Sequence, residues 1–185
     1  TAAGSTQINA GTAVSGTTWT LTGDAALTAT DVTVTTLDAD SALNLTASNN
    51  LDVTTATVDG NAVISTGGNT DIEQLTVTGT STLDAIGNAL GNIWNLIGTS
   101  DVEAGNITLA ELNTTGDTQL SAVNAIAVTD LSAAAASQIN AGTSATGSTW
   151  TLTGDAALTA TDVTVTTLDA DSALNLTASN NLDVT

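Results

Sequence analysis

The amino-acid sequence predicts an all-β fold, a parallel β-solenoid, in which short strands wind into coils that stack on one another. Three observations support this fold class. Apolar positions recur every 18 or 19 residues, a much longer block recurs later in the chain, and the composition is rich in Thr and Val and has no Pro. Thr and Val favour strands, and Pro interrupts them. At this period the chain corresponds to about 10 coils.

The long repeat joins two distant parts of the chain. Residues 18–54 recur unchanged as residues 149–185, and residues 7–17 recur with four substitutions as residues 138–148. We therefore expect a single continuous β-solenoid over residues 1–185, with a superrepeat at 1–131 and a partial second copy at 132–185.

Within the long repeat, four mostly apolar positions mark each coil. They lie at offsets 0, 2, 5 and 7 from coil starts at residues 14, 32, 51, 70, 89, 107, 126 and 145, so the 131-residue unit holds seven coils. The second coil shows the pattern as Val32, Val34, Leu37 and Ala39. Such alternation, bounded by Gly and Asn, predicts strands whose side chains point alternately into and out of the core.

Three further columns support this register. An aliphatic residue stands at offset 13 in every coil: Leu27, Leu45, Ile64, Leu83, Val102, Leu120 and Ile139. A turn column at offset 9 holds Gly23, Ser41, Gly60, Gly79, Gly98, Gly116 and Ala135, and the coil boundary holds Asp31, Asn49, Gly68, Gly87, Asn106 and Asn124. Strand starts at offsets 0, 5 and about 11 predict three short strands per coil. This uneven spacing favours a right-handed solenoid, because left-handed solenoids need an inward residue every six positions.

The three tryptophans occupy the offset-5 column as Trp19, Trp94 and Trp150, and each follows a glycine at offset 2, namely Gly16, Gly91 and Gly147. The other coils have Val, Ile or Leu at offset 2. A large ring facing an absent side chain keeps the volume of the layer constant, as close packing requires. We therefore expect the indoles to lie inside the coils.

Two segments leave a helix open as an alternative. Apolar residues in 83–97 also recur at intervals of three and four, and residues 131–139 include four consecutive alanines. The coil count stays in step through both segments, so we expect coils there, with a short helix bulging from the solenoid as the alternative.

The composition argues against several functions. The chain has no Lys, Arg, His or Cys, and its 19 acidic side chains give a formal charge of −19. We expect no nucleic-acid binding and no attraction to anionic membranes, because both need cationic side chains. No apolar run is long enough to insert into a membrane.

We also expect no enzymatic activity. Hydroxyl groups are plentiful, but the chain has no His, Lys or Tyr to activate one. Paired carboxylates in a polysaccharide-active enzyme remain the remote catalytic alternative. We assign no catalytic or cofactor-binding residues.

The coil period places acidic residues side by side in neighbouring coils. The four pairs are Asp40 with Asp59, Asp52 with Asp71, Asp84 with Glu103, and Glu111 with Asp130. Two charges at the strand spacing of about 4.8 Å repel by about 0.8 kcal/mol in water. The sequence leaves two interpretations open, namely Ca²⁺ bound between the stacked carboxylates or a loosely screened acidic face.

Local Thr-x-Thr arrays, such as Thr33 with Thr35, raise ice binding as another remote alternative. The offset-6 column is irregular, however, because it includes Asp38 and Asn95 among its threonines. Solvent-facing strands rich in Thr are the simpler interpretation.

The coil of about 19 residues, with segments such as Leu43–Ala47 (LNLTA) and Leu27–Ala29 (LTA), resembles the repeats of filamentous haemagglutinin-type exoproteins and related giant bacterial surface adhesins. This resemblance implies secretion, a long rod and roles in adhesion or in a matrix. The near-identical superrepeat and the absence of basic residues depart from it, and no binding residue carries over.

Taken together, these features predict a secreted, extracellular structural protein that forms a filament, a sheath or a surface fibre by stacking of coils. The alternative is the repetitive stalk of an adhesin on a bacterial surface. The expected partner is the chain itself, by axial continuation, end-to-end stacking and lateral association.

Overall fold

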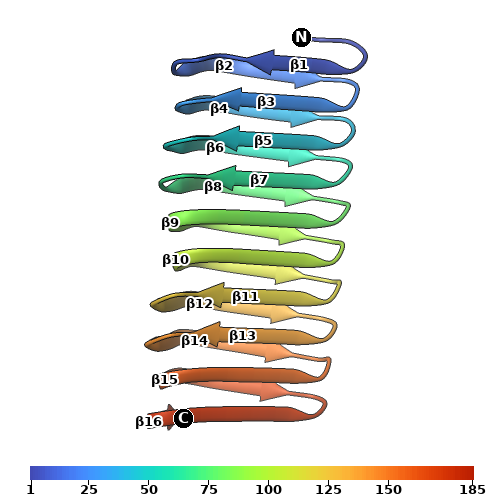
Figure 1. Ribbon diagram of the computed structural model, residues 1–185. Coiled ribbons are helices and arrows are strands. Elements are labelled where there is room, and N and C mark those ends of the chain that lie inside the picture. Colours follow the sequence, from blue (N-terminus) through green and yellow to red (C-terminus); the bar gives the residue numbers. More distant parts are fainter.

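The computed structural model describes residues 1–185 and shows a parallel β-solenoid made of strands and turns, without helices (Figure 1). The chain completes about 9 turns of about 19 residues each. The predicted fold class is confirmed, and the number of turns is close to the expected one. No helix long and apolar enough to cross a membrane is present.

Each coil contributes strands to two stacks. The first stack contains the short strands β1 (Thr6–Asn9), β3 (Ala25–Ala29), β5 (Leu43–Ala47), β7 (Ala62–Thr66), β11 (Thr118–Ala122) and β13 (Ser137–Ala141). The second stack contains β2 (Val14–Leu21), β4 (Val32–Ala39), β6 (Leu51–Val58), β8 (Thr70–Val77), β12 (Ala125–Ala133) and β14 (Ser144–Leu152). Four long strands run through both stacks: β9 (Ser81–Leu96), β10 (Ser100–Thr114), β15 (Ala156–Ala170) and β16 (Leu174–Val184).

The coil winds to the right, as the sequence analysis favours. In Figure 1 the strands of the first stack lie in front and run to the left, and those of the second stack run back to the right behind them. The chain descends as it winds, and this combination defines a right-handed turn.

Neighbouring coils pair in the predicted register. All strand pairs are parallel, and Val32 lies opposite Val14 of the coil before it and Leu51 of the coil after it. The offset-13 column is also continuous, since Leu45 pairs with both Leu27 and Ile64. Each column therefore carries one position of the repeat along the axis of the solenoid.

The structure differs from the prediction of three separate short strands per coil. The segments at offsets 0–2 and 5–7 form one bent strand, as in β4. Val34 and Leu37 are both buried although they are an odd number of positions apart, because the backbone turns a corner between them and changes the inward side. Pairing with β6 skips a single residue at this corner, which explains why the strand continues through it.

One hydrophobic core of 46 buried residues extends along the solenoid. Both segments that left a helix open contribute strands to it: residues 83–97 lie mostly in β9, and residues 131–133 and 137–139 lie in β12 and β13, joined by a bend at 134–136. Burial alternates along β13, with every second residue inside. The coil interpretation is confirmed for both segments.

The tryptophans pack against the glycines as predicted. A Cβ atom added to Gly91 would overlap the indole of Trp94 and would lie 2.5 Å from the carbonyl oxygen of Ile72 in the coil before. The indole Nε1 of Trp94 donates a hydrogen bond of 2.7 Å to that same carbonyl. Backbone pairing is interrupted there and resumes at Gln74, opposite Ile93. The side chain of Trp94 thus satisfies a buried carbonyl where the sheet does not.

The same arrangement recurs three coils later and is incomplete in the first coil. Trp150 donates to the carbonyl of Val128 over 2.8 Å, and both Trp94 and Trp150 are fully buried. Trp19 has no carbonyl partner in the structure and is only half-buried. The indole hydrogen bond therefore joins one coil to the coil before it.

The turns between the stacks use two devices. At offset 9, a Cβ on Gly98 would collide with the backbone of Gly79 in the preceding coil, so this column requires close backbone approach. At the opposite corner, asparagine side chains form a ladder. The backbone N–H of Asn69 donates to Oδ1 of Asn50 over 3.0 Å, and that of Asn88 donates to Oδ1 of Asn69 over 2.9 Å.

The tryptophan contact generates a stability prediction. We expect Gly91→Ala to lower the free energy of unfolding by roughly 3 kcal/mol, because it overpacks the indole and breaks a buried hydrogen bond. Urea denaturation measures this change. The double variant Gly91→Val with Trp94→Leu recreates the pair found at Val34 and Leu37 and is expected to recover most of the loss.

Gly11→Ala is the control, because a Cβ at Gly11 meets no atom within 4 Å. We expect it to change the stability by less than about 0.5 kcal/mol. An equal loss in Gly91→Ala and Gly11→Ala would contradict a specific role for the indole contact.

Candidate functional site

The structure places the predicted acidic pairs in neighbouring coils. Asp52 lies opposite Asp71, Asp84 opposite Glu103, and Glu111 opposite Asp130. Asp40 and Asp59 directly follow Ala39 and Val58, which pair with each other. Like charges therefore stack along the solenoid as expected, and no cationic side chain exists in the chain to offset them.

One of these pairs belongs to a larger acidic cleft. Asp52, Asp71 and Glu73 line a hollow of about 280 Å³ on the outer side of β6 and β8, together with Gly91 and Asn92. Burial raises the pKa of Asp71 above its ordinary value, and the neighbouring charges of Asp52 and then Glu73 raise it further. Glu73 was missed by the sequence analysis, although it lies two residues after Asp71 on the same outward face.

The other acidic pairs differ in their surroundings. Asn113 donates a hydrogen bond of 2.7 Å to Glu111 and a second one of 3.0 Å to Asn95. A neutral amide therefore offsets part of the charge at the pair of Glu111 and Asp130. No group of three or more His, Cys, Asp or Glu side chains in the structure could hold a metal ion. Calcium binding between stacked carboxylates stays a prediction.

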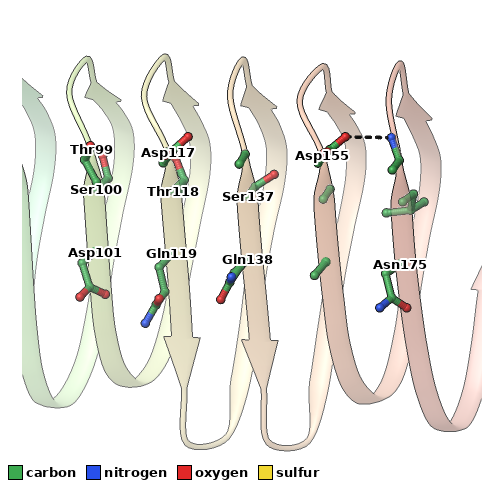
Figure 2. A pocket seen from close by; sticks show the side chains of 15 residues that line it. Thr99, Ser100, Asp101, Asp117, Thr118, Gln119, Ser137, Gln138, Asp155 and Asn175 are labelled. Carbon is green, nitrogen blue, oxygen red and sulfur yellow. Dashed lines mark hydrogen bonds between the residues drawn. The ribbon is translucent and has the colours of Figure 1, made fainter.

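A second feature is a groove along the start of the first-stack strands, which Figure 2 shows from close by. The groove encloses about 610 Å³ across five coils, from β10 to β16. The offset-10, offset-11 and offset-12 columns line it. The same three columns line a hollow of about 610 Å³ in the first coils, between Ser5 and Val63. The groove is therefore a property of the repeat rather than of one coil.

The wall of the groove at offset 12 presents amide and carboxylate groups. Figure 2 shows Asp101, Gln119, Gln138 and Asn175 in a row along the groove. Ala157 stands between Gln138 and Asn175 in this column. The base of the groove is formed by small residues such as Ser100 and Ser137. These groups can donate and accept hydrogen bonds, but none of them is a nucleophile with an activating base beside it.

The rim of the groove contains the second carboxylate with a shifted pKa. Oδ1 of Asp155 accepts a short hydrogen bond from the hydroxyl of Ser172 and one of 3.2 Å from the backbone N–H of Ala173. These bonds favour the ionised form, so they lower the pKa of Asp155 below its ordinary value. The first copy repeats this contact between Ser41 and Asp24. The role of this carboxylate is thus to close the turn.

The acidic cleft generates a pH prediction. Because the folded pKa of Asp71 is raised, its ionised form costs stability above that pKa, and the cost is relieved as the pH falls through it. We expect Asp71→Asn to be more stable than the native chain at neutral pH and to lose this advantage on mild acidification. Thermal denaturation across the pH range measures both effects.

The control for this prediction is Asp183→Asn. Asp183 occupies the same column but lies opposite Thr164 instead of a carboxylate. The lowered pKa of Asp155 has the opposite effect on stability. Its ionised carboxylate stabilises the folded chain, and this stabilisation is lost as the pH falls through the folded pKa of Asp155. An equal gain in both Asn variants at neutral pH would attribute the effect to net charge and not to the cleft.

The stacked carboxylates also predict a dependence on cations. Sodium is expected to raise the melting temperature by screening, and calcium to raise it further at equal ionic strength if it bridges carboxylates. Asp71→Asn should then reduce the calcium-specific part. Equal melting temperatures in chelator and in millimolar calcium, at matched ionic strength, would leave only the screened acidic face.

In comparisons with known proteins, the chain matches no family model, no curated protein and no solved structure. The resemblance to haemagglutinin-type repeats therefore rests on the period and the coil segments alone. What is established is the parallel β-solenoid with coils of about 19 residues.

Proposed function

We propose that the protein is an extracellular structural repeat protein that forms a filament, a sheath or a surface fibre by axial stacking of coils. The fold is compatible with such a role. One observation supports it above the others: successive coils pair through the same columns in one parallel register, so each coil presents to the next the surface that the coil before presents to it.

The two copies show what a following coil contributes. Leu51 is 1% exposed beside β8, whereas its identical counterpart Leu182 in β16 is 55% exposed. Val53 and Val184 differ in the same way. The comparison shows that this apolar column is buried by the neighbouring coil and not by its own coil. Coils that bury their apolar layers by stacking favour an extended rod.

Location outside the cell is supported by the resemblance to secreted repeats and by the charge. A protein with 19 acidic and no basic side chains is repelled by nucleic acids and by anionic membrane surfaces. The same charge keeps rods from collapsing onto one another at random. A rod of this type acts by its length and stiffness, so the proposal includes no catalytic step.

The stalk of an adhesin is the second candidate. The observation that favours it is the groove lined by Asp101, Gln119 and Gln138, since a row of hydrogen-bonding groups at the coil spacing suits a neutral, extended polymer. An adhesin stalk would end in a distinct binding domain, and a filament would consist of coils throughout. The full-length sequence distinguishes the two. Ice binding is disfavoured because Asp38 pairs with Thr20 and Thr57 and breaks the outward threonine column.

The proposal predicts an axial period. Seven coils at about 4.8 Å each give a rise of roughly 34 Å per 131-residue unit. Fibre diffraction or helical reconstruction of assemblies of the chain is expected to show both spacings, with the strands perpendicular to the fibre axis. Isolated monomers under all conditions, or an axial period far from this rise, would overturn the proposal.

A matched pair of variants tests the stacking in solution. In a free chain, Leu51→Ser should cost much more stability than Leu182→Ser, because only Leu51 is buried. In axial assemblies the two should become similarly damaging. Comparison of the melting temperatures of free and assembled chains measures this change.

A further inference from the structure

Large apolar side chains alternate with glycines along one corner of the solenoid. This corner strip, at offset 16 of the repeat, consists of Gly67, Ile86, Gly105, Val123 and Gly142 in five successive coils. A register shift at Gly105 sets this glycine against both Ile86 and Gly87 of the coil before. Ile86 is 77% exposed and Val123 is 76% exposed, the two highest values among the large hydrophobic residues. The strip is therefore a row of two apolar projections with glycine gaps beside each of them.

The glycines are structurally required at their places. A Cβ on Gly105 would lie 2.7 Å from the carbonyl oxygen of Gly87, and a Cβ on Gly142 would overlap the carbonyl oxygen of Val123. The gaps therefore cannot be filled by side chains of the chain itself. They can be filled only from outside.

The corner strip is also uncharged. Its neighbours at the coil boundary are Gly68, Gly87, Asn106, Asn124 and Thr143. Carboxylates occur at this boundary only beyond the strip, as Asp31 and Asp162. Two copies of a chain with a charge of −19 repel each other over most of their surface, whereas the strip itself carries no charge. The nearest outward carboxylates, Asp84 and Glu103, lie two residues before Ile86 and Gly105.

We propose that the corner strip joins two copies of this chain side by side and antiparallel. In the register that we propose, Val123 packs into the gap at Gly105 of the second copy, and Ile86 packs into the gap at Gly142. A two-fold axis makes each contact twice, so one surface is complementary to itself. Projections and gaps on the same strip point to a second copy and not to an unrelated partner.

The charges select this register over its neighbour. Shifting the pair so that Ile86 faces Gly105 would set Asp162 of one copy opposite Asp31 of the other. The proposed register sets Asp162 opposite the glycines at 67 and 68 instead. Like-charge juxtaposition disfavours the shifted arrangement.

This inference deepens the proposed filament and rests on it, because each 131-residue unit would present the strip again. Two side chains bury far less than the roughly 1,200 Å² of a stable interface, so a single pair of chains is held weakly. Repetition along a rod adds many copies of the same weak contact, and their sum can hold two rods together. The corner strip is thus a means of pairing rods laterally.

Disulfide cross-linking tests the register, because the chain has no cysteine of its own. In the proposed pair the two copies of residue 123 are offset by one coil, about 4.8 Å along the axis, and those of residue 86 by three coils, about 14 Å. A disulfide needs Cα atoms within about 7 Å. We expect Val123→Cys to form cross-linked dimers on oxidation, and Ile86→Cys to form no more than the off-strip control Ile97→Cys.

Sedimentation equilibrium tests the contact itself, in roughly 0.5 M NaCl, which shortens the screening length to a few ångströms. The double variant Ile86→Ser with Val123→Ser is expected to raise the dimer dissociation constant at least about tenfold. Ile97→Ser, at a different corner and 48% exposed, should leave it unchanged. All the substituted side chains are exposed, and circular dichroism verifies that each variant stays folded.

Three results would overturn the inference: a chain that stays monomeric at millimolar concentration in this salt, equal weakening by Ile97→Ser, or cross-linking at residue 86 as efficient as at residue 123. If these results appear while the axial period of roughly 34 Å is present, the filament stands and only the lateral contact is wrong. If the axial period is also absent, both proposals fail.

Discussion

The hydrogen bonding of each coil to the identical strand positions of the next is the constraint on which the structure depends. Parallel strands in register place residue upon residue, so Val32 meets Val14 and Leu51 and never an outward side chain. The side chains in one column must therefore be able to lie in contact with one another. Aliphatic columns meet this condition and build the core. Acidic columns such as Asp52 with Asp71 are tolerated only at the surface, where burial and then the charge of Asp52 raise the pKa of Asp71.

Residues that differ in size or polarity from the rest of their column are accommodated by contacts with a neighbouring coil. Trp94 is accommodated because Gly91 has no side chain and because Ile72, one coil earlier, offers its carbonyl. The asparagine ladder at Asn50 and Asn69 also joins neighbouring coils, because each side chain accepts a hydrogen bond from a backbone N–H of the coil after it. Polar and oversized residues thus strengthen the same axial contacts that the sheet makes, which is why one core can extend without interruption.

The columns and the burial of the indoles could be predicted from the sequence, because parallel stacking converts the period of the repeat directly into contact. What could not be predicted depends on the shape of the corners. The merging of two strands in β4, the inclusion of Glu73 in the acidic cleft and the groove beside Gln119 follow from how sharply the backbone bends, and spacing does not encode that. The ladder at Asn50, Asn69 and Asn88 follows the coil period visibly, but its hydrogen bonds also require the corner geometry.

The long repeat contains a whole number of coils, and this limits how the length of such a chain can change. A duplication or loss of one whole superrepeat returns every later residue to its own column, so Leu182 comes to stand where Leu51 stands. An insertion of one residue within a strand would turn the inward-facing side chains after it outward. Chains with more or fewer whole superrepeats would therefore fold by the same rules and differ only in the length of the rod.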